Sequence, residues 1–230
     1  YLVVAPPNSE ERTHPVKKFV GNGMRPEVWR RLLQRFGDIQ VVEFYGSTEG
    51  NIVIGNVGGE KIGSVGQPLA GAGEVALVKY DAAGGALVRD DSGHGTLCET
   101  GEAGLLVARI EEEQPLARFD GYDNEAETDL KIVRDLFEQG DAWFNSGDLM
   151  RQDEDGDFWF VDRLGDTFRW KGENVSTSQV ADTLGEAPFV AFAAVYGVEL
   201  PDREGRAGMA AIQIVEGSAF DGKVLYDTVV

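Results

Sequence analysis

Cysteine and histidine are almost missing from this sequence of 230 residues. Cys98 is the only cysteine, which excludes an internal disulfide and fits a reducing compartment such as the cytosol. His14 and His94 are the only histidines, and neither belongs to a cluster with ligand spacing, so a zinc site built by the protein is not expected. Apolar runs are also short, since none reaches the roughly 18 residues that a membrane-spanning helix needs.

Positive charge is scarce as well. Lysine and arginine total 21 against 40 aspartates and glutamates, which gives a net charge of −19. A chain this acidic repels phosphate backbones and anionic headgroups, which argues against a nucleic-acid partner. A bound ATP or CoA would therefore need individually placed cations or a metal ion. With 42% hydrophobic and 27% charged residues, the composition is that of a globular protein of one or two domains.

The first part of the sequence has the pattern of an α/β fold. Residues 26–36 form an amphipathic helical pattern that starts at Pro26 and ends before Gly37. The largely apolar run from Ile39 to Phe44 then predicts a buried strand, as in a parallel sheet. It leads into the polar loop Tyr45 to Asn51, and ligands of open α/β sheets collect beyond the carboxyl ends of strands. This loop is the first candidate site.

From about residue 58 the pattern changes to short strands punctuated by glycines. Its clearest strands are Glu74–Tyr80 and Leu105–Ile110, and the pattern predicts a small barrel or a twisted antiparallel sheet. A helix is expected over Asn124–Glu138, closed by Gly140. Together these features predict a β-rich region after the α/β piece.

A hairpin is expected next, with Ala142–Arg151 and Phe158–Val161 paired across the turn dipeptide Asp155-Gly156. The best domain boundary follows it, near Leu164 and Gly165. We therefore expect α/β structure over residues 1–57, β-rich structure over 58–163, and a separate α+β unit over 164–230.

The last unit begins with strong local signals. Ser176 and Gln179 form a capping box, which predicts a helix that Gly185 closes. Strands are expected over Phe189–Val198 and Met209–Val215.

The loop Tyr45 to Asn51 brings two hydroxyls and a carboxylate to the end of a predicted strand. These groups could bind a phosphate and a Mg²⁺ ion, which prefers oxygen ligands and shares the substrate's phosphates. The spacing around Ser47 differs from a G-x-S-x-G nucleophile elbow, and the loop lacks the lysine of a P-loop. On chemistry alone, an ordinary polar turn remains an equal alternative.

A second stretch places Asp148 in one strand of the hairpin, with Arg163 across from it. A carboxylate can accept hydrogen bonds from both hydroxyls of a ribose, and an arginine could steady it. A structural ion pair explains the same residues. The nearby Asp153, Asp155 and Asp157 do not fit a calcium loop, because the glycine and glutamate that an EF-hand requires are missing.

The third stretch, residues 165–174, is rich in glycine, cationic and aromatic residues. Gly165 could act as a hinge, and Arg169 and Lys171 suit an anionic cofactor. Taken alone, a basic surface loop is the simpler reading.

The order and spacing of these stretches resemble the adenylate-forming superfamily of acyl-CoA synthetases. FYGSTEGN, WFNSGDL and DRLGDTFRWKGENVS are similar to the fatty acid transport protein and very-long-chain acyl-CoA synthetase branch, as are GNGMRPEVW and FDGKVLYDTVV. The resemblance covers essentially the whole chain. It implies that residues 1–163 are the C-terminal part of a large AMP-binding domain and 164–230 part of the small C-terminal domain.

The resemblance also assigns roles around the nucleotide. It implies that Gly21, Asn22 and Gly23 line the adenine and acyl side, and that Tyr45 stacks on adenine. Gly46 and Ser47 belong to the same nucleotide-binding group.

Further roles follow from the same motifs. Thr48 would contact the α-phosphate, and Glu49 would hold Mg²⁺, which makes these two the implied catalytic residues. Asp148 would bind the ribose hydroxyls with help from Arg163.

In the third stretch, Gly165 would be the hinge between the domains, and Lys171 and Gly172 would lie along the CoA path. The implied reaction joins a fatty acid, ATP and CoA in two steps, through an acyl-adenylate. Positioning and neutralisation of phosphate charge would supply most of the catalysis.

Two family features have no counterpart here: the phosphate loop that precedes these motifs, and the adenylation lysine that follows them. The N-terminus, Tyr1 to Pro7, also lacks a methionine and a signal-peptide pattern. We expect a piece of a longer enzyme that is inactive alone. Bacterial relatives imply a cytoplasmic location, with peripheral association at the inner membrane as an option.

Two alternatives stay open. One is a CoA ligase of the same superfamily for another acid, of carnitine type or aryl type. The other is a lipid-transport or regulatory relative that no longer makes thioesters.

Overall fold

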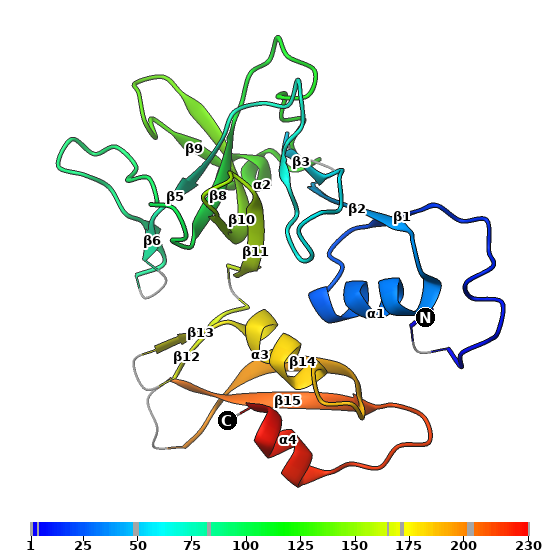
Figure 1. Cartoon of the computed structure of the whole chain (residues 1–230). Coiled ribbons are helices and arrows are strands. Elements are labelled where there is room, and N and C mark those ends of the chain that lie inside the picture. Colours follow the sequence, from blue (N-terminus) through cyan, green and yellow to red (C-terminus); the bar gives the residue numbers. More distant parts are fainter. Residues whose placement is uncertain are drawn as a thin grey trace. The chain divides into compact units, whose positions relative to one another are not determined.

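The computed structural model describes residues 2–3, 5–47, 51–81, 84–164, 166–170, 173–201 and 205–229. They group into two compact units, each described by itself below (Figure 1). Unit 1 joins Tyr1–Lys17, Arg25–Ile39 and Val161–Val230, and unit 2 joins Lys18–Met24 and Gln40–Phe160. The predicted boundary near Leu164 stays a prediction. Among the described helices, none is long and apolar enough to cross a membrane.

A small mixed sheet in unit 2 carries the first candidate residues. Its order is β1-β2-β3-β4, with β1 Lys18–Gly21, β2 Gln40–Gly46, β3 Val53–Asn56 and β4 Gln67–Pro68. β1 runs parallel to β2, whereas β3 is antiparallel to both β2 and β4.

The strand predicted over Ile39–Phe44 is therefore present as β2, but it is not buried throughout. Val41 and Glu43 are buried, whereas Phe44 is 40% exposed, because only one side chain in two faces the interior.

A five-stranded sheet forms the rest of unit 2, in the order β11-β10-β8-β5 with β9 beside β10 (Figure 1). The neighbouring strands β5, β8 and β10 are antiparallel, which confirms the predicted antiparallel arrangement. The bounds are β5 Val75–Val78, β8 Gly104–Arg109, β9 Ile132–Arg134, β10 Ala142–Gln152 and β11 Phe158–Arg163, and a separate short pair is formed by β6 Tyr80–Asp81 and β7 Ala86–Leu87.

The core of unit 2 joins the two sheets. Ile54 of the small sheet and Ile52, just before β3, pack with Leu106 and Phe144 from the larger sheet, and all four are at most 1% exposed. The predicted hairpin is also confirmed, since β10 and β11 are neighbours around Gly156, where φ is 88°. Tyr45, near the end of β2, packs against this cluster.

The helix predicted over Asn124–Glu138 is wrong beyond its second turn. Helix α2 covers only Glu125–Leu130, and the chain continues as β9. Ile132 and Val133 pair with Phe144 and Trp143 of β10, a tertiary pairing that overrides the local helical pattern.

The loop after β9 is held by a buried carboxylate. Asp141 accepts backbone N–H bonds from Leu136, Phe137 and Glu138 at 2.6, 3.0 and 3.1 Å. It also accepts from Trp143 Nε1 at 2.8 Å. These bonds hold residues 136–138 in a turn that a helix cannot form.

Helix α1, Pro26–Phe36, matches the predicted helix and belongs to unit 1. Pro26 occupies the first turn, and Gly37 ends the helix at a φ of 79°, with its N–H bonded to Leu33 O at 3.0 Å. Trp29 and Leu32 are its buried residues.

The C-terminal part of unit 1 is an α+β arrangement. Ser176 caps α3, because its Oγ accepts from Gln179 N at 3.2 Å, so this half of the predicted capping box is confirmed. α3 packs with Ala193 of β14 and Ile212 of β15 in one hydrophobic cluster, to which Leu225 of α4 adds. The bounds are β12 Phe168–Trp170, β13 Glu173–Val175, α3 Thr177–Gly185, β14 Val190–Glu199, β15 Arg206–Ile214 and α4 Gly222–Val229.

Candidate functional site

Two of the predicted site residues meet in unit 2 through a hydrogen bond. The Tyr45 hydroxyl donates to Asp148 Oδ2 at 2.5 Å, although 103 positions separate the two residues in sequence. Asp148 is 7% exposed, and the partly buried Tyr45 packs against the hydrophobic core. A hydrogen bond to a charged acceptor is among the stronger ones in proteins. The end of β2 and the middle of β10 therefore form one site.

Local irregularity in β10 sets the position of Asp148. The register of β10 on β8 shifts between Asn145 and Leu149, and Gly147 has a φ of 77° that favours glycine. Asn145 Oδ1 accepts from Gly147 N at 2.9 Å. Ser146 Oγ donates to a backbone carbonyl of β8 and accepts from Asp148 N at 3.0 Å. The Asn-Ser-Gly sequence thus builds a bulge that directs the carboxylate.

A second buried carboxylate lies beneath the predicted Gly21-Asn22-Gly23 turn. Glu43 is the parallel-ladder partner of Gly21 and is 2% exposed. Its Oε1 accepts the N–H of Gly23 and, at 3.0 Å, the N–H of Met24. Sequence reasoning missed Glu43, although a single charged residue inside the apolar run Ile39–Phe44 was a usable signal.

The environment of Glu43 favours its neutral form. Burial raises the pKa of this carboxyl, and the backbone N–H bonds from Met24 and Gly23 lower it by less. Its other oxygen, Oε2, is buried and has no hydrogen-bond partner among the described residues. Such an arrangement is costly unless a further group satisfies it.

The buried side-chain polar atoms without a partner gather in this one stretch. Within the described part of the chain they are Glu43 Oε2, Ser47 Oγ and Asn51 Oδ1. Buried polar atoms are normally hydrogen-bonded, so these three atoms are exceptions among the described residues.

Asn51 fixes the far end of the same loop. Its Nδ2 donates to Arg109 O at 2.6 Å and to Ala117 O at 2.8 Å, and the residue is 2% exposed. Asn51 is a second residue to which sequence reasoning assigned no role. A polar residue at the end of a glycine-flanked motif was the available signal.

The remaining predicted residues differ in what can be described. Asn22 is exposed, and Gly46 ends β2 opposite Val53. The predicted residues Thr48, Glu49, Gly165, Lys171 and Gly172 lie outside the described residues. In the described ranges, no three acidic, histidine or cysteine side chains form a group that could hold a metal ion.

Arg163 is the last residue of β11, and its side chain is exposed. Its backbone N–H donates to Asp162 Oδ1 at 2.9 Å. Asp162 is 1% exposed and also accepts from Thr177 N at 2.7 Å, at the start of α3. The assistance of Arg163 to Asp148 stays a prediction.

The three aspartates that resemble a calcium loop surround a lysine. Lys61 Nζ lies 2.8 Å from Asp153, 2.7 Å from Asp155 and 2.9 Å from Asp157. Hydrogen bonds to these carboxylates raise the pKa of Lys61. Burial raises the pKa of Asp153, but hydrogen bonds from Lys61 and Trp159 outweigh it and the net shift is downward. The cluster is an ion network in which Lys61 neutralises the three aspartates.

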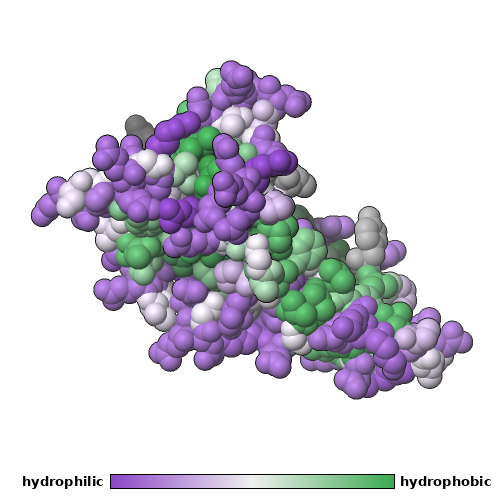
Figure 2. All heavy atoms as spheres, turned by 90° about the horizontal axis from the view of Figure 1, so that it is seen from above, coloured by the Kyte–Doolittle hydropathy of each residue, from purple (hydrophilic) through white to green (hydrophobic). Residues whose placement is uncertain are grey.

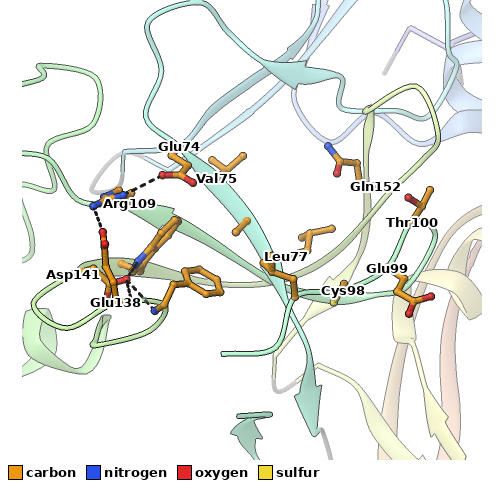
Figure 3. A pocket seen from close by; sticks show the side chains of 14 residues that line it. Glu74, Val75, Leu77, Cys98, Glu99, Thr100, Arg109, Glu138, Asp141 and Gln152 are labelled. Atoms are coloured by element: carbon orange, nitrogen blue, oxygen red, sulfur yellow. Dashed lines mark hydrogen bonds and ion pairs between the residues drawn. The ribbon is translucent and has the colours of Figure 1, made fainter. Parts of the chain in front are cut away.

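A separate pocket of about 580 Å³ opens beside β5 (Figure 3). The described residues that line it include none of the predicted site residues. Its one arginine, Arg109, is paired with Glu74 at 3.4 Å and with Glu138. Burial raises the pKa of the Cys98 thiol there to about 11, so the thiol is protonated at neutral pH and a poor nucleophile. The predicted site therefore lies outside this pocket.

Comparison with known proteins gives a consistent result. Residues 4–107 match the family described as AMP-binding enzyme. The chain is 45% identical over 229 residues to long-chain fatty acid transport protein 2 of Rattus norvegicus, a match that covers 98% of this chain and 36% of that protein. It is 44% identical over 229 residues to the medium/long-chain-fatty-acid–CoA ligase FadD6 of Mycobacterium tuberculosis, covering 100% of this chain and 37% of that protein.

The fold also matches a solved structure of another protein. The solved structure of the amide bond synthetase McbA from Marinactinospora thermotolerans matches with a TM-score of 0.69 and 28% identity, over 92% of this chain and 38% of that chain. The chain thus spans little more than a third of the length of each of these proteins. The chain belongs to the AMP-binding, adenylate-forming enzymes, in the branch of the long-chain fatty acid transport proteins and fatty-acid–CoA ligases.

Proposed function

We propose that this chain supplies part of the nucleotide site of an ATP-dependent ligase that converts long- or very-long-chain fatty acids to acyl-CoA. The hydrogen bond between Tyr45 and Asp148 carries the proposal, because it unites two separated motifs in one polar site. The name of the mycobacterial relative, a medium/long-chain-fatty-acid–CoA ligase, supports the choice of substrate.

In the proposed site, the Tyr45 ring stacks on adenine and the Asp148 carboxylate accepts the ribose hydroxyls. Gly21, Asn22 and Gly23 line the adenine and acyl side. Asp148 is already buried, so its charge is little screened by water and acts strongly on a ribose donor.

The reaction needs no covalent bond to the protein. A fatty carboxylate oxygen attacks the α-phosphorus of ATP, pyrophosphate leaves, and an acyl-adenylate forms. The CoA thiolate then attacks the acyl carbon, and AMP leaves. Thr48 contacts the α-phosphate in this scheme, and Arg163 assists Asp148 at the ribose.

Further ligands complete the proposal. Mg²⁺ held by Glu49 would neutralise phosphate charge, which a chain with a net charge of −19 cannot do with many cations of its own. Gly165 serves as the hinge, and Lys171 and Gly172 lie along the CoA path. We place the enzyme in the cytoplasm, with peripheral contact to the inner membrane where fatty acids arrive.

The test is fatty-acid-dependent exchange of pyrophosphate into ATP by the full-length protein that carries this chain, with Mg²⁺ present. We expect exchange with long-chain fatty acids, followed by thioester formation when CoA is added. Exchange only with carnitine-type or aryl acids would point to another ligase of the superfamily. The absence of exchange with every acid would point to a relative that has lost catalysis.

A further inference from the structure

The Glu43 carboxyl joins the Gly21–Met24 turn to β2 through two hydrogen bonds. Both accepted N–H groups, those of Gly23 and Met24, come from residues that immediately follow β1. Gly23 has a φ of 75°, a conformation that L residues rarely adopt. The turn therefore depends on an external acceptor to hold it, and Glu43 provides that acceptor.

The second carboxyl oxygen faces the same turn. A Cβ atom at Gly21 would overlap Glu43 Oε2, so the glycine leaves room for the carboxyl. This oxygen is buried without a hydrogen-bond partner among the described residues. A buried polar atom left without a hydrogen-bond partner costs folding free energy, so this oxygen does not account for the stability of the turn.

We infer that Glu43 is a positioning residue of the nucleotide site, an inference that rests on the proposed function. The Glu43 carboxyl holds the Gly21–Met24 turn in the conformation that receives the ligand. Glu43 acts on the turn backbone through its Oε1 atom. Its effect on affinity is therefore transmitted by the turn.

Amide hydrogen exchange tests the tether without any catalytic assay. In Glu43→Ala, the amides of Gly23 and Met24 lose their acceptor, and we expect exchange at least about tenfold faster than in the unmutated chain. Glu43→Gln retains an oxygen acceptor and should stay within about threefold of the unmutated protein. Glu60→Ala, which removes an exposed glutamate of the same unit, is the control. Unchanged exchange in Glu43→Ala overturns the inference.

Direct ATP titration of the full-length protein tests the role in the site. Glu43→Ala should raise the Kd for ATP about tenfold at unchanged stoichiometry, and Glu43→Gln should restore it to within about threefold. A purely structural residue would lower the fraction of binding protein instead of the affinity. ATP binding that is equally tight in Glu43→Ala contradicts the inference, whether or not fatty acids are activated.

A double substitution tests the predicted overlap. Gly21→Ala alone should raise the Kd for ATP about tenfold, since its methyl group pushes against the carboxyl. In the Glu43→Ala background, only the flexible Met24 methyl group stays close to the new Cβ, at 3.1 Å, so Gly21→Ala should add less than about threefold. Gly58→Ala is the matched control, because its Cβ would meet only the Glu60 side chain at ordinary contact distance. Simple additivity of Gly21→Ala and Glu43→Ala counts against the inference. If the protein binds ATP as described but forms no acyl-adenylate, the proposed activation of fatty acids is wrong and the inference about Glu43 still holds.

Discussion

At the residue scale, the hydrogen bond between Tyr45 and Asp148 has a consequence for stability as well as for binding. The Asp148 carboxylate is 7% exposed, so loss of the tyrosine hydroxyl removes a donor from a buried charge. We expect Tyr45→Phe to lower the free energy of unfolding by about 1.5–3 kcal/mol, measured by urea denaturation. Tyr226→Phe, at a residue 62% exposed, is the control. Equal midpoints for the two variants would show that the hydroxyl contributes nothing.

Glu43 makes a prediction about pH. Its pKa in the folded chain lies above the ordinary value of 4.5, mainly because of burial. The folded state therefore holds its proton to higher pH than the unfolded state, and this residue's contribution to stability falls as pH rises through that interval. Glu43→Gln removes the titration.

We accordingly expect the stability of the unmutated chain, relative to Glu43→Gln, to decline as the pH is raised above 4.5. Thermal unfolding of both proteins across this range measures the difference. Parallel stability curves for the two proteins would mean that Glu43 ionises in the folded chain as it does in the unfolded one.

At the element scale, local signals predict some elements and fail for others. Helix α1 follows from Pro26 and Gly37, and α3 follows from the Ser176 cap, because these residues act on their own neighbours. The β10–β11 hairpin follows from the turn at Gly156. In contrast, β9 exists only because β10 lies beside it, which no local pattern reveals.

The same distinction applies to the candidate site. Tyr45 and Asp148 are predicted from motifs that resemble a known family, and the structure brings them together. Glu43 and Asn51 were missed, because their burial and their bonds to distant backbone groups arise from tertiary packing. Sequence patterns indicate which side chains carry the chemistry more readily than they indicate which residues hold those side chains in place.

Asp141 holds the turn that replaces the expected helix. It accepts four hydrogen bonds, three of them from consecutive backbone N–H groups. Asp141→Ala should lower the free energy of unfolding by about 3 kcal/mol in urea denaturation, because four donors, those of Leu136 and Trp143 buried, lose a charged acceptor. Asp123→Ala, at an exposed position, should change it little. A similar small effect for both would show that the turn forms without the carboxylate.

The Lys61 network joins the loop after β3 to the β10–β11 hairpin. Lys61→Met would leave three carboxylates close together without their cation, so we expect a lower Tm at neutral pH. The loss should shrink as the pH falls toward and below 3.8, the ordinary pKa of an aspartate, since protonation removes the repulsion. A loss of Tm that does not vary with pH would assign the effect to packing.

At the scale of the whole molecule, the acidic net charge of the chain bears on the proposed binding of an anionic nucleotide. Hydrophilic residues cover much of the visible face in Figure 2, and acidic residues outnumber basic ones by 40 to 21. Under the proposed function, an anionic nucleotide would be held by a few well-placed groups and by hydrogen bonds to neutral parts of the ligand. Ribose hydroxyls and the adenine ring are such parts, and Asp148 and Tyr45 have matching chemistry.

The central claim is that Asp148 accepts hydrogen bonds from a bound ribose, and one thermodynamic cycle tests it. Titrate ATP and its 2′,3′-dideoxy analogue into the full-length protein and into Asp148→Ala. The unmutated protein should bind the analogue about ten- to a hundredfold more weakly than ATP, and Asp148→Ala should bind both equally weakly. Undiminished discrimination by Asp148→Ala would contradict the account.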